Sequence, residues 1–230
     1  MTTTTGPARE RTGRRQALVV RGGWAGHAPV ETTDLFLPAL VDAGYAVTIA
    51  DDLDVYRDDV LLRGTDLVVQ CWTRGRLTED QCAGLVSAVE AGTGFAGWHG
   101  GIVAAFPGDR RYQRMVGGEF LHHPDEFLTY DVHIDPAHVG HPIVAGLADF
   151  QVTTEQYWMH TDALNDTIAS TVIAAGSGGP HERAVPMPVA WTRRWGRGKV
   201  FVSSIGHSVD DLREPVVRTL TTRGLLWAGR

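Results

Sequence analysis

The chain has 230 residues, 43% of them apolar, and 21 Lys and Arg residues stand against 27 Asp and Glu, a formal net charge of −6. This composition indicates a globular protein with a substantial core, and one large domain is the default for this length. The acidic balance disfavours nucleic acid or an anionic membrane as a partner, because both require a basic face. No apolar run approaches the roughly 18–20 residues that span a bilayer, and residues 1–16 lack the apolar core of a secretory signal, so we expect a cytoplasmic protein.

The predicted elements begin after an N-terminal segment, residues 1–15, that is rich in Thr, Arg and Gly. We expect this segment to be a disordered tail and residues 16–230 to form a single domain. From residue 17 onward, short β-branched runs alternate with amphipathic stretches, which is typical of βαβ units on a parallel sheet. The expected strands are 17–20, 46–49, 67–69 and 94–97.

Three segments between and after these strands have helical spacing of their apolar residues. They cover residues 31–43, 78–91 and 214–227. The second is the best defined, because Thr78 and Gln81 have the spacing of a capping box and Gly92 stands where a helix ends.

The stretch 120–190 is richer in Pro, His and Asp, and it predicts a loop-rich β extension. Its expected strands are 127–134, 170–175 and 188–192. The runs 189–191 and 200–203, separated by Gly196 and Gly198, predict an antiparallel hairpin added to the sheet. The sequence therefore predicts an α/β fold with a mostly parallel central sheet and an added β extension.

Histidines follow three of the predicted strands. His27 comes after the first strand, His99 after the fourth and His207 after the last. Because ligands gather at the carboxyl ends of parallel strands, these side chains predict a shared site. Imidazole suits proton transfer or metal ligation, so a divalent ion, zinc or manganese, is one interpretation. The glycines around His99 match neither a P-loop nor G-x-G-x-x-G, so no nucleotide cofactor is expected.

Further candidates for the site follow downstream. Glu119 with His122, and Glu155 with His160, combine general-base and metal-ligand side chains, although neither pair has a tight zinc spacing. Aromatic residues recur beside these segments and could form a wall for a sugar ring or simply pack in the core. They are Trp24, Trp98, Tyr157 and Trp158. Cys71 has no neighbouring cation in the sequence and is interpreted as a buried structural thiol.

Several spaced motifs in this order resemble the trehalose-utilisation (ThuA-like) family, over residues 17–228. They are Gly22-Gly23-Trp24 with His27, Trp98-His99-Gly100, Gly117-Gly118-Glu119-Phe120 with His122-His123-Pro124, Glu155-Gln156-Tyr157, Pro188-Val189-Ala190-Trp191, and Gly198-Lys199-Val200-Phe201 leading to Gly206-His207. The resemblance implies a class I glutamine amidotransferase-like fold, a flavodoxin-like three-layer sandwich. His99 stands where those enzymes carry their catalytic cysteine, so glutamine hydrolysis is not expected.

The resemblance also implies a role in the use of trehalose or related glucosides, beside a dehydrogenase that produces 3-keto sugars. We hypothesise that histidines and carboxylates, with or without a metal, abstract the acidified C2 proton, and that isomerisation or cleavage follows. The catalytic candidates are His99, His27, His207, Glu119, Glu155 and His160; the substrate-binding candidates are Trp24, Trp98, His122, Tyr157 and Trp158; the metal candidates are His27, His99 and His207. The alternatives are a non-catalytic sugar-binding or regulatory domain and a glycosidase with Glu119 and Glu155 as its carboxylates. Homo-oligomerisation is left open.

Overall fold

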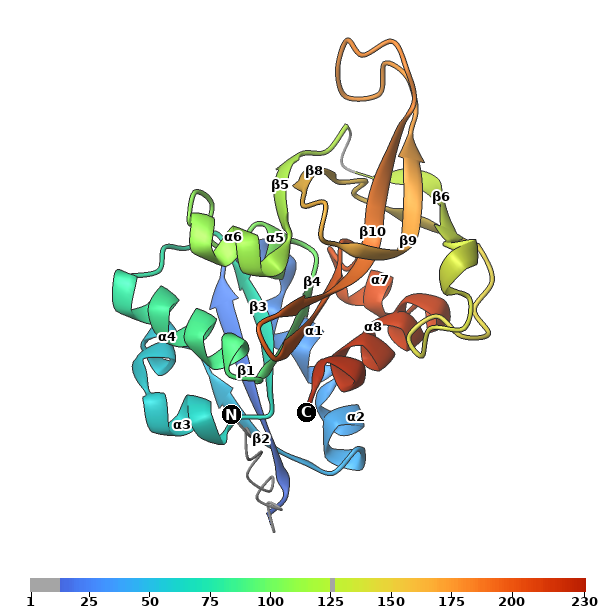
Figure 1. The fold of residues 1–230 in the computed structure, drawn as a ribbon. Helices are drawn as coiled ribbons and strands as arrows, with labels where there is room; N and C mark the ends of the chain where they lie inside the picture. Colours follow the sequence, from blue (N-terminus) through green and yellow to red (C-terminus); the bar gives the residue numbers. More distant parts are fainter. Residues whose placement is uncertain (1–12, 125–126) are drawn as a thin grey trace, which may run out of the picture.

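The computed structural model describes residues 13–124 and 127–230, which form a mixed α/β fold around one large sheet (Figure 1). The sheet has nine strands in the order β2-β1-β3-β4-β11-β10-β9-β6-β7. The first five are parallel to one another: β2 (Tyr45–Ala50), β1 (Arg15–Gly23), β3 (Leu67–Thr73), β4 (Gly94–Trp98) and β11 (Gly198–Ser203). This half contains the four strands that the apolar runs predicted.

The remaining strands are antiparallel and form the predicted β extension. They are β10 (Val185–Trp195), β9 (Asp166–Ile173), β6 (Leu128–Ile134) and β7 (Phe150–Thr154). The predicted hairpin is confirmed, because β10 and β11 pair from Ala190↔Ser203 to Trp195↔Gly198. Two short strands that were not predicted, β5 (Gly118–His122) and β8 (Trp158–Thr161), form a separate antiparallel pair.

Helices cover both faces of the parallel half (Figure 1). One face carries α1 (Pro29–Asp34), α2 (Leu37–Asp42), α7 (Val209–Arg213) and α8 (Pro215–Ala228); the other carries α3 (Asp59–Gly64), α4 (Glu79–Glu90), α5 (Gly100–Val103) and α6 (Arg110–Val116). Short 3-10 turns lie at Ala25–His27, Leu53–Arg57 and Pro136–His138. Along β1, Ala17 and Val19 pack with the core of the first face, whereas Leu18 and Val20 pack with that of the second. This double burial explains why the strand reads as a continuous apolar run.

The structure corrects one helix and confirms another. The segment 31–43 is not a single helix, because α1 ends at Asp34 and α2 begins at Leu37. Pro38 has no N–H to donate to the Asp34 carbonyl, and its ring clashes with a helical turn before it. Helix α4 has the predicted capping box: Gln81 N–H donates to Thr78 Oγ1, and Thr78 N–H donates to Gln81 Oε1.

The first strand begins at the end of the predicted tail. Residues 1–12 of that tail lie outside the described residues. Strand β1 begins at Arg15, the last residue of the predicted tail, and Arg15 pairs with Tyr45 of β2. Across the described ranges, no helix is both long and apolar enough to cross a membrane.

Candidate functional site

Three loops at the carboxyl edge of the parallel strands bring His27, His99 and His207 together. Their ring centroids lie 4.7 Å (His27–His99), 5.0 Å (His27–His207) and 5.5 Å (His99–His207) apart. His27 ends the turn after β1, His99 directly follows β4, and His207 lies in the loop after β11. The geometric expectation that these histidines meet is therefore confirmed.

Glu155 enters the same cluster from the β extension, in the connection between β7 and β8. Its Oε2 lies 3.0 Å from His99 Nε2, and its Oε1 lies 3.2 Å from His207 Nδ1. One ligand atom from each of His27, His99, Glu155 and His207 lies within 4.8 Å of all the others. This four-residue set is called the His3Glu cluster below.

His99 occupies a sharp strand-to-helix turn with φ 50° and ψ −145°, a backbone conformation that L side chains seldom adopt. The turn projects its ring over the sheet edge, as in a nucleophile elbow. His99 Nδ1 is 2.8 Å from the Ser204 carbonyl oxygen, which can only accept, so Nδ1 carries a proton and donates it. His99 Nε2 lies 3.0 Å from Glu155 Oε2 and 2.6 Å from the Tyr157 hydroxyl oxygen.

The electrostatics favour neutral imidazoles at His27 and His99 and an ionised carboxylate at Glu155. Burial, aided by the nearby His99 and His207, lowers the pKa of His27 to about 3, and burial also lowers the pKa of His99. For Glu155, burial raises the pKa, but the imidazoles of His207 and His99 outweigh it, and the net shift is downward. These are the protonation states in which imidazole and carboxylate bind metal ions.

A pocket of about 240 Å³ opens beside the His3Glu cluster, and His27 and Glu155 form part of its lining. Trp24, Phe120 and Tyr157 supply aromatic surface, while Glu119, His123, Thr73 and Arg74 supply polar groups. The mixture of aromatic walls with a few convergent polar groups is typical of small-molecule sites.

Several predicted site residues lie elsewhere. Trp98 is 1% exposed and packs against Phe36 in the core, and Trp158 packs against His181. His122 bonds the Gly178 carbonyl in the loop between β9 and β10. His160 is exposed and lines a separate depression beside α6, which Glu119 also borders. The structure thus brings neither Trp98, Trp158, His122 nor His160 to the pocket, and core or surface packing accounts for them.

Three polar residues that line the pocket were not among the predicted site residues. His123 Nε2 lies 3.6 Å from Glu155 Oε1, although no sequence pattern favours it over the adjacent His122. Thr73 Oγ1 is 2.8 Å from His27 Nδ1 and fixes that ring. Thr73 and Arg74 end and follow β3, so the rule that sites lie at strand ends was the available signal.

Two further titratable residues lie outside the His3Glu cluster. Cys71 is buried and free, and burial raises its pKa to about 12, in agreement with a structural thiol. His133 pairs with Asp149, outside the pocket.

The whole chain was compared with known proteins. Residues 16–228 match the family model described as trehalose utilisation, ThuA. The chain belongs to this family. No curated protein matches it.

Among solved structures, similar folds occur in ThuA-like proteins from Bacteroides uniformis (16% identity, TM-score 0.73, 97% of this chain and 95% of that one) and Parabacteroides merdae (15%, 0.71, 94% and 90%). A cytoplasmic protein from Salmonella typhimurium is also similar (13%, 0.65, 94% and 100%). At these identities the likeness establishes the fold alone.

The donor set of the His3Glu cluster fits a divalent metal ion. Four donor atoms bonded tetrahedrally to one zinc ion at about 2.0–2.2 Å lie about 3.3–3.6 Å apart. The four donors lie within 4.8 Å of one another, so side-chain movements of up to about 1 Å would bring them to this spacing.

Proposed function

We propose that this ThuA family member is an enzyme that abstracts a proton from 3-keto glycosides, with a divalent ion, zinc or manganese, held by the His3Glu cluster. The observation that carries the proposal is the opening of this cluster into a pocket with aromatic walls. The pocket volume of about 240 Å³ lies just below the range of about 300–1,000 Å³ of sites for drug-sized ligands, which suits a single sugar ring. When bound, the ion would act as a Lewis acid that polarises a substrate oxygen.

The chain's own residues would perform the proton transfer. The C3 ketone acidifies the C2–H bond; a base takes this proton, and the electron pair of the broken bond forms the enolate C2=C3–O⁻. Reprotonation then gives an isomer. Alternatively, the electron pair re-forms the C3 ketone and creates a C1=C2 double bond, while the glycosidic oxygen leaves C1 and takes up a proton. Both routes conserve atoms and electrons without an oxidant or reductant.

His123 is the proposed base. It lines the pocket outside the His3Glu cluster, and Glu155 lies 3.6 Å from its Nε2, close enough to orient the ring. Tyr157 also lines the pocket, and its hydroxyl, 2.6 Å from His99 Nε2, would donate to the enolate oxygen. Trp24 offers an aromatic face, 41% exposed, against which a sugar ring can pack.

The test is to incubate the protein, loaded with zinc or manganese, with a 3-keto-glucoside in deuterated buffer and to follow C2 by NMR. We expect exchange or turnover in the wild type, and loss of at least a hundredfold in rate for His123→Asn with its metal content retained. His133→Asn, outside the pocket, is the matched control. The absence of exchange and of turnover across a panel of keto-glycosides would exclude the proposal, and saturable binding without exchange would favour the non-catalytic sugar-binding alternative.

Three wider expectations accompany this proposal. The parallel strands follow the order β2-β1-β3-β4-β11, which corresponds to the 2-1-3-4-5 order of flavodoxin-like folds and supports a three-layer sandwich of the amidotransferase-like type. A sugar 3-dehydrogenase would supply the substrate. A cytoplasmic location is proposed as well, supported by the similar fold of the cytoplasmic protein from Salmonella typhimurium.

A further inference from the structure

Arg74 and Trp24 form a pair at the pocket that the proposed proton transfer does not use. The guanidinium carbon of Arg74 lies 4.8 Å from the centre of the Trp24 ring, and both residues line the pocket. Within the described ranges, no carboxylate lies within 4 Å of this guanidinium, and no hydrogen bond involves its side chain. Its N–H groups are therefore available to a ligand.

The backbone holds the pair in place. Trp24 N–H donates to the Thr73 carbonyl at 2.8 Å, and Arg74 N–H donates to the Ala104 carbonyl at 3.0 Å. Arg74 has φ 56°, an uncommon conformation for a residue other than glycine. A Cβ atom on Gly26 would lie 2.3 Å from the Trp24 ring, so only glycine there permits the ring to fold back beside Arg74.

The charges near the pocket decide which ligand suits Arg74. Glu119 already accepts hydrogen bonds from Gln113 Nε2 and from the Gly108 N–H, and Glu155 belongs to the His3Glu cluster. This step rests on the proposed function, in which a divalent ion occupies the cluster. The ion and Arg74 then carry three positive charges against two negative charges on Glu119 and Glu155, so the net charge is +1. The pocket then attracts an anion, and a guanidinium stacked on an aromatic ring presents its N–H edge to a planar or tetrahedral oxyanion.

We propose that the Arg74–Trp24 pair selects substrates that carry an anionic substituent, a carboxylate or a phosphate, on the sugar. Trp24 would contact the C–H face of the sugar ring, while Arg74 would bind the oxyanion. The natural substrate class would then be a sugar acid or a sugar phosphate derivative rather than a neutral glucoside.

The experiment is isothermal titration of the protein, as purified and after metal loading, with D-glucuronate, D-glucose 6-phosphate and D-glucose. We expect at least one anionic sugar to bind about tenfold more tightly than glucose, and added salt to reduce this preference. Arg74→Gln should reduce the preference to about twofold, and Arg74→Lys should retain part of it because it keeps the charge without the forked geometry. Preference for glucuronate alone or for the phosphate alone identifies the group.

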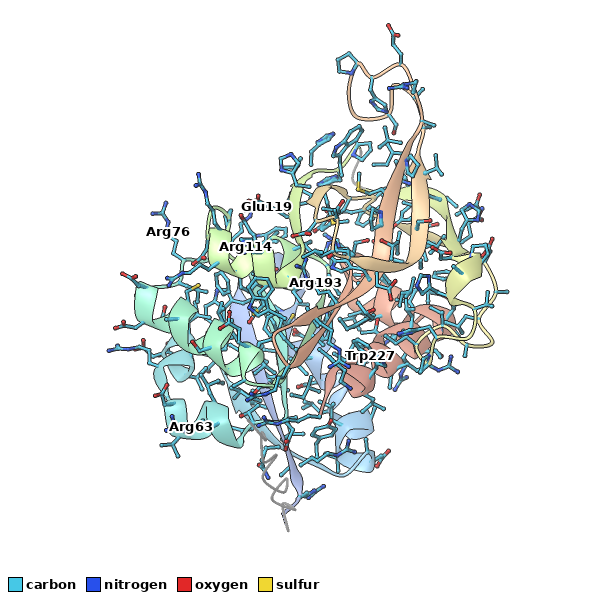
Figure 2. The ribbon with its side chains drawn as sticks, viewed as in Figure 1. Arg63, Arg76, Arg114, Glu119, Arg193 and Trp227 are labelled. Atoms are coloured by element: carbon cyan, nitrogen blue, oxygen red, sulfur yellow. The ribbon has the colours of Figure 1, made fainter. Side chains whose placement is uncertain are left out.

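The control variant is Arg76→Gln, which removes the same charge from a neighbouring arginine at the periphery of the molecule (Figure 2). It should leave the preference unchanged. Equal affinity for glucose, an undiminished preference in Arg74→Gln, or no binding of any of the three sugars would overturn the proposal. The readout is binding, so loss of C2 exchange with an intact anion preference would indicate failure of the proposed reaction alone.

Discussion

At the scale of single residues, the site depends on close approaches that leave no room for additional atoms. Gly100, which follows His99, is the clearest case: a Cβ atom there would lie 2.4 Å from Cε1 of His27 and 3.2 Å from the Tyr157 hydroxyl. His27 and Tyr157 can therefore occupy these positions only because residue 100 has no side chain.

We predict that Gly100→Ala displaces the His27 ring and weakens binding of zinc or manganese at least tenfold, because one of four donors leaves its position. Metal affinity measured by titration calorimetry tests this. Gly64→Ala is the matched control, since a Cβ at Gly64 meets nothing within 4 Å. Unchanged affinity in Gly100→Ala would contradict the assignment of His27 as a ligand.

The two cysteines permit a prediction about thiol reactivity. Burial raises the pKa of Cys71 to about 12, and burial together with Asp109 raises that of Cys82 to about 11. Because the thiolate is the nucleophile, neither residue should react with iodoacetamide in the native protein at pH 8, whereas both should react after denaturation. Mass spectrometry of the alkylated protein provides the measurement, and rapid native labelling of Cys71 would show that it is not a structural thiol.

The raised pKa values of the two thiols also predict how the free energy of unfolding changes with pH. Unfolded thiols lose their protons near pH 9, while the folded thiols keep them to about pH 11–12. The unfolded state then binds fewer protons, so the free energy of unfolding should fall as pH rises from about 9 to 11. Cys71→Ala should reduce this slope, as measured by urea titrations at each pH, and an unchanged slope would indicate that Cys71 does not contribute.

At the scale of elements, helix α4 shows how a local signal specifies a boundary. Thr78 and Gln81 satisfy each other's backbone N–H groups, and the apolar stripe behind them, Leu85 and Val89, is fully buried. Helices α1 and α2 show the opposite case, because Pro38 interrupts a periodic pattern that would otherwise continue.

We expect Thr78→Ala to reduce the free energy of unfolding by about 1 kcal/mol, the usual contribution of an N-cap side chain. Urea denaturation followed by circular dichroism measures the change. Thr78→Ser retains the hydroxyl oxygen and should lie within a few tenths of a kcal/mol of the wild type. A loss of equal size in both variants would indicate that the methyl group, and not the cap, is responsible.

At the scale of the whole molecule, the His3Glu cluster joins segments that are distant in the sequence. His27, His99 and His207 follow strands of the parallel half, and Glu155 follows β7 at the far edge of the sheet. An ion on these residues would connect the parallel half to the β extension, and binding to the folded state alone stabilises that state.

We therefore predict that zinc or manganese at one hundred times its Kd raises stability by about 2.7 kcal/mol. For a chain of this length, this corresponds to an increase in Tm of about 5–10 °C. Differential scanning calorimetry with and without EDTA tests the effect, which His207→Ala should abolish and His133→Ala should leave intact. No change in the wild type would argue against a metal at the cluster.

The sequence by itself determined the parallel strands, helix α4, the hairpin and the meeting of three histidines, because strand periodicity and capping are local signals and parallel strands share an edge. Pro38 is also a local signal for a helix break, but the prediction of one helix over 31–43 did not take it into account. Only the tertiary structure decided that Glu155 completes the His3Glu cluster, that His123 lines the pocket beside it, that Arg74 lies on Trp24, and that Trp98 belongs to the core. These outcomes depend on how the β extension folds back and on which face of an element is buried, and neither is encoded in the spacing of neighbouring residues.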